Sequence, residues 1–170
     1  MKPPAVFSSP TAEWHNASYD AISPSPLSLY MATKIIVITG SGRGIGDKTV
    51  RAFAIAGAAH VALIGRTSST LFQSKATVAA EFPSAQISTY TADVADQAAI
   101  RKIVEAIGAC DVLILNVKLG GESGPIGQAN PDDWWHVFEI GTLRSIFGAT
   151  RSPIIFYSPC RLVLAAKYYS

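Results

Sequence analysis

Apolar runs alternate with amphipathic segments through the middle of this chain. The runs are continuous, which is typical of parallel strands that are covered on both faces. The segments between them repeat their apolar positions with the helical period of about 3.6 residues. The pattern predicts strands at 34–39, 60–64, 86–91 and 111–116, and helices at about 44–56, 68–82 and 96–107. Such an alternating series predicts the α/β class and a doubly wound parallel sheet.

Local signals predict where the helices begin and end and which faces they bury. Ser68 or Ser69 is expected to cap the second helix, and Asn130, followed by Pro131, to cap a fourth. Gly108 is expected to end the third helix. The first helix is expected to bury the face formed by Ile45, Thr49, Ala52, Phe53 and Ala56.

The two ends of the chain depart from the alternating pattern. Residues 1–32 are rich in Pro, Ser and Thr and predict a flexible arm before a folded domain at 33–150. Residues 151–170 form a divergent tail, so the sheet is expected to be incomplete on its C-terminal side. Within the tail, 153–157 is a candidate fifth strand, and 162–166 is either another strand or a short helix.

Composition narrows the classes of partner. The formal charge of +2, without a cluster of Lys or Arg, argues against a nucleic-acid or membrane surface. Cys110 and Cys160 match no metal spacing, and His15, His60 and His136 are scattered. The first residues have no long apolar core, so no secretory leader is expected, and no apolar run is long enough to span a bilayer. A cytoplasmic protein that binds no metal, membrane or nucleic acid is expected.

The most informative segment runs from Thr39 to Gly46, directly after the first predicted strand. Glycines let the backbone turn tightly and approach an anion, and the start of the following helix offers free N–H groups and a positive dipole end. The segment therefore predicts a phosphate site. It lacks the Gly-Lys-Ser/Thr of a Walker loop and follows the spacing Thr-Gly-x-x-x-Gly-x-Gly, with Gly40, Gly44 and Gly46.

This spacing, with residues downstream, resembles the short-chain dehydrogenase/reductase family over about residues 34–140. Asp93-Val94 looks like the family's pair whose Asp contacts adenine, and Asn116 ends the fourth strand as in the family's Asn-Ala-Gly turn. Trp134–Ile140 is similar to fungal members. The resemblance implies a Rossmann fold, an NAD(P) cofactor and an alcohol dehydrogenase or ketone reductase lineage. It implies cofactor binding by Gly40, Ser41, Gly42, Arg43, Gly44, Ile45, Gly46, Asp93, Val94 and Asn116.

The residue type at the end of the second strand predicts which of the two nicotinamide cofactors binds. Related NAD-binding folds place a carboxylate about 20 residues after the glycine loop, where it holds the ribose hydroxyls. In this chain Arg66 occupies that region, and Arg43 supplies a second positive charge within the loop. A guanidinium suits a 2′-phosphate, and a charged hydrogen bond contributes about 1.5–3 kcal/mol. NADP(H) is therefore expected in preference to NAD(H).

The family's catalytic pair has no suitably placed counterpart. In the family a tyrosine acts as general acid and base, and a lysine four residues later on the same helix lowers its pKa. Tyr30 and Lys34 have this spacing, but Lys34 starts the first strand, at the end of the sheet opposite the cofactor. Tyr157 is followed at that distance by Arg161, with Pro159 between them. We predict no catalytic residue.

Two interpretations of the function remain. One is an NADP(H)-binding short-chain oxidoreductase, truncated or divergent at its C-terminus, acting on a small molecule that the sequence does not identify. The other is a non-catalytic dinucleotide-binding module. The chain could form homo-oligomers, but their formation is expected to be impaired. Family members often pair their subunits through helices near the C-terminus, and only part of that surface is expected here.

Overall fold

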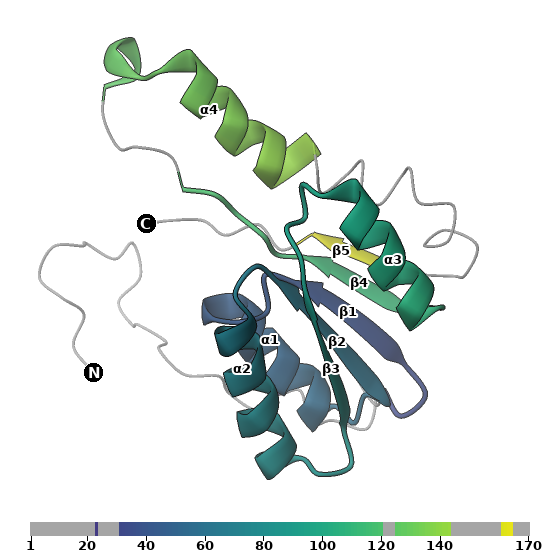
Figure 1. Cartoon of the computed structure of the whole chain (residues 1–170). Helices are drawn as coiled ribbons and strands as arrows, with labels where there is room; N and C mark the ends of the chain where they lie inside the picture. The colour runs from purple at the N-terminus through teal and green to yellow at the C-terminus, as the bar shows by residue number, and fades with distance from the viewer. Residues whose placement is uncertain (1–22, 24–30, 121–124, 144–160, 165–170) are drawn as a thin grey trace, which may run out of the picture.

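The computed structural model describes residues 23, 31–120, 125–143 and 161–164, which contain one five-stranded parallel sheet (Figure 1). The strand order is β3-β2-β1-β4-β5. The strands are β1 (Ile35–Thr39), β2 (His60–Gly65), β3 (Gln86–Thr91), β4 (Val112–Leu115) and β5 (Arg161–Leu164). The helices are α1 (Gly44–Ile55), α2 (Ser68–Glu81), α3 (Gln97–Ile107) and α4 (Pro131–Phe138), with a 3₁₀ turn η3 (Ile126–Gln128) before α4 and a π-helical turn η4 (Glu139–Leu143) after it. The predicted fold class is confirmed.

Helices cover both faces of the sheet, and strands β1 to β4 divide their side chains between the two faces. Ile38 of β1 belongs to one buried cluster with Val50 of α1 and Leu71 of α2. Val37 of the same strand belongs to a second cluster with Ile103 of α3. Figure 1 accordingly shows α1 and α2 on one side of the sheet and α3 on the other. Because burying each such aliphatic side chain contributes about 1.5–3 kcal/mol, two covered faces explain the continuous apolar runs.

The face that α1 was expected to bury is buried only in part: Ala56 is buried and Phe53 packs against the core, whereas the first turns differ. Gly46, Val50 and Ala54 are buried within the helix, whereas Ile45 is 45% exposed. The glycine loop brings Gly46 against the backbone carbonyl of Gly40, and this contact sets the rotation of the helix about its axis. Residues four apart share a helix face, so the buried face is displaced by one position over the first turns.

Two helices carry a side-chain cap. Asp96 caps α3 and Asn130 caps α4, each through an oxygen that accepts backbone N–H groups, so the expected cap at Asn130 is confirmed. The expected cap of α2 at Ser68 or Ser69 is wrong, because both lie within its first turn. The N-cap of α2 is Thr67, whose side chain forms no cap hydrogen bond.

The tail supplies the fifth strand. Of the two candidate segments, the one around Leu162 is a strand: it pairs in parallel with β4, placing Leu113 opposite Leu162 and Leu115 opposite Leu164. The candidate strand at 153–157 and nearly all of the predicted arm at 1–32 lie outside the described residues. In the part of the chain that the structure describes, no helix has the length and apolar character needed to cross a bilayer.

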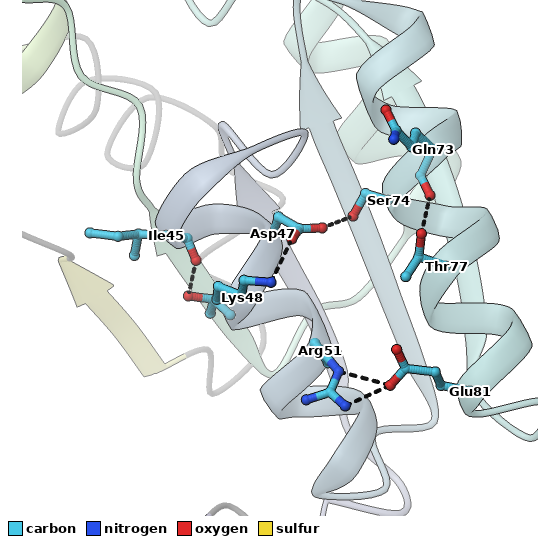
Figure 2. A network of polar contacts seen from close by, with 9 residues as sticks. Ile45, Asp47, Lys48, Arg51, Gln73, Ser74, Thr77 and Glu81 are labelled. Atoms are coloured by element: carbon cyan, nitrogen blue, oxygen red, sulfur yellow. Dashed lines mark hydrogen bonds and ion pairs between the residues drawn. The ribbon is translucent and has the colours of Figure 1, made fainter. Parts of the chain in front are cut away.

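Polar contacts fasten α1 to α2 beside the glycine loop (Figure 2). Ser74, whose side chain is buried, donates a hydrogen bond to the Asp47 carboxylate at 2.7 Å. One turn further along α1, Arg51 donates to Glu81 through Nε at 2.8 Å, with Nη2 at 2.7 Å from the same oxygen. The Asp47 carboxylate, which would repel a phosphate, is therefore held toward α2.

The opposite, amino end of the sheet is held by Asp111. Its Oδ1 accepts a hydrogen bond from Lys34 Nζ, and its Oδ2 accepts one from the backbone N–H of Ile35, both at 2.8 Å. The hydrogen bond from Lys34, and next that from Ile35, hold the pKa of Asp111 below its ordinary value. Asp111 therefore ties the start of β4 to the start of β1.

Asp111→Asn is expected to lower the free energy of unfolding by about 1 kcal/mol near neutral pH. Because the folded-state pKa lies below the unfolded-state value of about 4, the ionised carboxylate stabilises the fold above that value, and its contribution disappears as the pH falls through the folded-state pKa. Urea unfolding should therefore show a difference from wild type that shrinks in acid. Glu105→Gln, which removes an exposed carboxylate from α3, is the control. A difference independent of pH contradicts the assignment.

Candidate functional site

The carboxyl ends of β1 and β4 meet where the strand order reverses. β1 pairs with β2 on one side and with β4 on the other. In open α/β sheets ligands bind in the crevice at such a point. A cavity of about 560 Å³ lies there, a volume typical of small-molecule sites. Its lining includes Gly40, Gly42, Arg43, Gly44, Ile45, Gly65, Arg66, Thr67, Thr70, Asp93, Val94, Asn116, Val117, Lys118, His136 and Ile140.

The structure brings the predicted site residues together from four loops. All of them line this cavity except Ser41 and Gly46. Ser41 is fully buried, and its Oγ donates a hydrogen bond to the carbonyl of Ile64 at the end of β2, at 3.3 Å. Gly46 is buried in the first turn of α1. These two residues support the loop from behind.

Two glycines of the loop occupy places that no other residue fits. Gly40 has a φ of +66°, in the left-handed region that favours glycine. Gly46 lies within α1 but has no space for a side chain: a Cβ there would clash with the carbonyl oxygen of Gly40 and would lie 2.7 Å from Asn116 Nδ2. The loop therefore folds back on itself tightly, which leaves its backbone bare toward the cavity.

Neighbouring strands anchor the loop. The N–H of Gly40 donates to the carbonyl of Ile64 at 2.8 Å. From the other side, Asn116 Nδ2 donates to the carbonyls of Thr39 at 3.2 Å and Gly40 at 3.1 Å, and the backbone N–H of Asn116 donates to Thr39 Oγ1 at 3.1 Å. The side-chain N–H groups of Asn116 therefore bind the loop, and this residue fixes the shape of the site.

The two helices that begin at the cavity are the two without side-chain caps. α1 starts after Arg43, whose backbone is extended and whose side chain forms no cap hydrogen bond. α2 starts after Thr67, which provides no cap either, and Thr70 in its first turn also lines the cavity. The first N–H groups of a helix need partners outside it, and the dipole favours anions there. The cavity thus offers two helix N-termini to anionic groups.

Charged side chains around the cavity are mostly basic. Among the described residues, Arg43, Arg66 and Lys118 line it, together with one carboxylate, that of Asp93. Arg66 Nη1 lies 3.9 Å from Asp93 Oδ2, and the two side chains are 65% and 45% exposed. The other oxygen of Asp93 accepts a hydrogen bond from the N–H of Ala95 at 2.9 Å. A cavity with this charge suits a ligand that carries several negative charges.

Among the ionisable residues that line the cavity in the described part of the chain, two were missed by sequence reasoning. Lys118 follows the predicted site residue Asn116 by two positions, and this closeness in sequence could have identified it as a residue of the site. His136 is exposed on α4 and also lines the cavity. No local signal predicts this, because the position of α4 depends on the course of the chain before it.

Of the candidate catalytic pairs, the structure describes Lys34, which does not line the cavity. Lys34 is bound to Asp111 at the amino end of the sheet, away from the glycine loop. Tyr30 and Tyr157 lie outside the described residues. Tyr90, the tyrosine that the structure describes, lies on β3 and does not line the cavity. In the described ranges no group of three or more His, Cys, Asp or Glu side chains is placed to hold a metal ion.

A glycine loop between β1 and α1, placed at the switch point of a parallel sheet, defines a dinucleotide-binding class of protein. Comparison with known proteins gives the family. Residues 34–154 match the short chain dehydrogenase family, so this chain belongs to it. It is 35% identical over 138 residues to the short chain dehydrogenase/reductase AacuD of Aspergillus aculeatus, covering 81% of this chain and 48% of that one. A short chain dehydrogenase/reductase of Claviceps purpurea is 31% identical over 137 residues, covering 81% and 47%.

Solved structures share the fold. L-sorbose reductase from Gluconobacter frateurii, complexed with NADPH and L-sorbose, superposes with a TM-score of 0.64 at 27% identity, covering 72% of this chain and 47% of that one. A short chain dehydrogenase from Salmonella enterica gives a TM-score of 0.67 at 27% identity, covering 79% and 56%. The chain spans about half the length of the curated relatives it matches. The family is one of oxidoreductases that bind NAD(P).

Proposed function

We propose that this chain binds NADP(H), as the cofactor-binding part of a short-chain oxidoreductase. The observation that carries the proposal is that Arg66, at the end of β2, lines the same cavity as the glycine loop. The ribose of a dinucleotide whose pyrophosphate lies on the loop falls in the region after the second strand. A guanidinium there favours a 2′-phosphate over a hydroxyl.

The glycine loop supports the pyrophosphate part of this proposal. Gly46 lies so close to Gly40 that no side chain fits at this position, and no side-chain cap occupies the N–H groups at the start of α1. A pyrophosphate on this helix start is stabilised by those groups and by the helix dipole. Asn116 and Ile64 hold the loop in place for it.

Three features support the extra phosphate of NADP(H). Arg66 is only loosely paired, since its 3.9 Å distance to Asp93 is too long for a hydrogen bond. Arg43 is exposed beside the same cavity. The N-terminus of α2 follows Thr67 without a side-chain cap. A charged hydrogen bond from a guanidinium contributes about 1.5–3 kcal/mol, enough for roughly a 10- to 150-fold preference.

When bound, NADP(H) supplies the hydride for interconversion of an alcohol and a carbonyl compound. Arg43, Arg66 and the backbone of the glycine loop would hold the cofactor, and Asn116 would keep that loop in shape. One observation favours binding without catalysis: Lys118 lines the cavity where the family has the glycine of its Asn-Ala-Gly turn. A non-catalytic dinucleotide-binding module is therefore the second candidate function.

Calorimetric titration of the full chain with NADPH and with NADH tests the proposal. NADPH should bind saturably and at least about tenfold more tightly than NADH, because the two differ only in the phosphate that Arg66 and Arg43 face. Circular dichroism establishes that the titrated sample is folded. A folded chain that binds neither nucleotide contradicts the dinucleotide site, and equal affinities contradict the choice of NADP(H). Adding carbonyl compounds and following NADPH absorbance then separates the enzyme from the non-catalytic module.

A further inference from the structure

We propose that Asp93 is a specificity-determining residue, whose carboxylate opposes the extra phosphate of NADP(H) and limits the preference that Arg66 creates. The inference deepens the proposed function and rests on it. Of the charged groups that line the cavity in the described part of the chain, Asp93 is the one carboxylate. Its consequence is that the natural chain discriminates less strongly between the two nucleotides than its basic residues allow.

The position of the carboxylate is set by the backbone. The N–H of Ala95 donates to Asp93 Oδ1 at 2.9 Å, in a short turn between β3 and α3. The backbone N–H of Asp96 donates to the carbonyl of Asp93 at 3.0 Å and closes the same turn. With one oxygen held in this way, Oδ2 faces Arg66 Nη1 at 3.9 Å. The negative charge is therefore part of the site and does not swing freely on the surface.

The pairing of the two side chains is weak. At 3.9 Å the atoms are within ion-pair range but beyond a hydrogen bond, and both side chains are largely exposed. Asp93 therefore orients the guanidinium of Arg66 very little. Its main effect on a ligand at Arg66 is electrostatic: it partly neutralises the cation and repels a second anion at short range.

The negative charge of Asp93 is expected to change the affinity for NADPH and not that for NADH. NADPH and NADH share the adenine ring, both riboses, the pyrophosphate and the nicotinamide, so any contact that Asp93 makes with those parts cancels in the ratio of affinities. The 2′-phosphate carries nearly two negative charges, whereas the 2′-hydroxyl carries none. A carboxylate beside Arg66 therefore weakens NADPH binding and leaves NADH binding nearly unchanged.

Asp93→Asn tests the proposal, because asparagine keeps an oxygen for the N–H of Ala95 and removes the charge. We expect the dissociation constant of NADPH to fall by about fivefold, the size of one exposed charge pair, while that of NADH changes by less than about twofold. In an Arg66→Ala background the same substitution should change the NADPH-to-NADH ratio by less than about twofold, since the phosphate is no longer held beside Asp93.

Asp96→Asn is the matched control. It removes an equal charge three residues away, does not line the cavity, and keeps a good helix cap for α3. Equal ratios for Asp93→Asn and wild type, or the same shift in Asp96→Asn, overturn the role of Asp93. A wild-type chain with no NADPH preference overturns the assignment of Arg66 instead, so the two failures are distinguishable. Far-ultraviolet circular dichroism of each variant separates lost binding from lost folding.

Discussion

Gly46→Ala is expected to reduce nucleotide binding at least about tenfold and to lower the free energy of unfolding by about 1–3 kcal/mol. A Cβ at this position would clash with the carbonyl oxygen of Gly40, which is a backbone atom and cannot rotate away. The nearest relief is to move the loop, and the loop is tied to Ile64 on one side and to Asn116 on the other. The substitution is therefore expected to distort the part of the loop on which the pyrophosphate is proposed to lie.

Gly127→Ala is the matched control for this substitution. Gly127 lies in the exposed turn η3, does not line the cavity, and a Cβ built on it meets no other atom within 4 Å. This variant should bind NADPH with nearly wild-type affinity in the same calorimetric titration and unfold at nearly the same urea concentration. If Gly46→Ala binds and unfolds like Gly127→Ala, the loop is not packed as described, and the pyrophosphate site is in the wrong place.

Arg66→Asp is expected to invert the cofactor preference. NADPH affinity should fall roughly 100-fold, because a charged hydrogen bond is lost and a carboxylate is added beside Asp93. The affinity for NADH should fall little, since a carboxylate after the second strand suits the ribose hydroxyls. Titration with both nucleotides measures the ratio directly.

Arg101→Asp makes the same change of charge on the exposed surface of α3. It should leave the ratio of affinities within about twofold of wild type, because exposed charges farther apart than about 10 Å are screened by salt. The ratio, and not the absolute affinity, is the quantity to compare, since it is insensitive to small differences in folding. An unchanged ratio in Arg66→Asp would mean that another group selects the nucleotide.

Most of the sheet could be predicted from the sequence. The strand predicted at 86–91 is β3 to the residue, and those predicted at 60–64 and 34–39 differ from β2 and β1 by one position at one end. These elements are specified locally, because a strand covered on both faces shows a continuous apolar run wherever it lies. The glycine spacing likewise predicts a sharp turn from the residues alone.

Which residues of the glycine loop line the cavity and which support the loop from behind could not be predicted in this way. The sequence treats Gly40 to Gly46 as one contiguous cofactor motif, but the folded loop presents some residues to the cavity and turns Ser41 inward to Ile64. Which residue faces which way depends on where β2 and β4 lie relative to the loop. Those positions follow from strand pairing over long sequence separations.

The chain by itself thus determines an alternating α/β fold, a turn that suits a phosphate and a guanidinium at the end of the second strand. Only the tertiary structure decides that Asn116 holds the loop, that α1 buries the face of Gly46, and that Asp93 stands beside Arg66. The reason is physical: periodicity and turn chemistry act between neighbours in sequence, whereas these contacts join the ends of separate strands, which only the pairing of the sheet brings together.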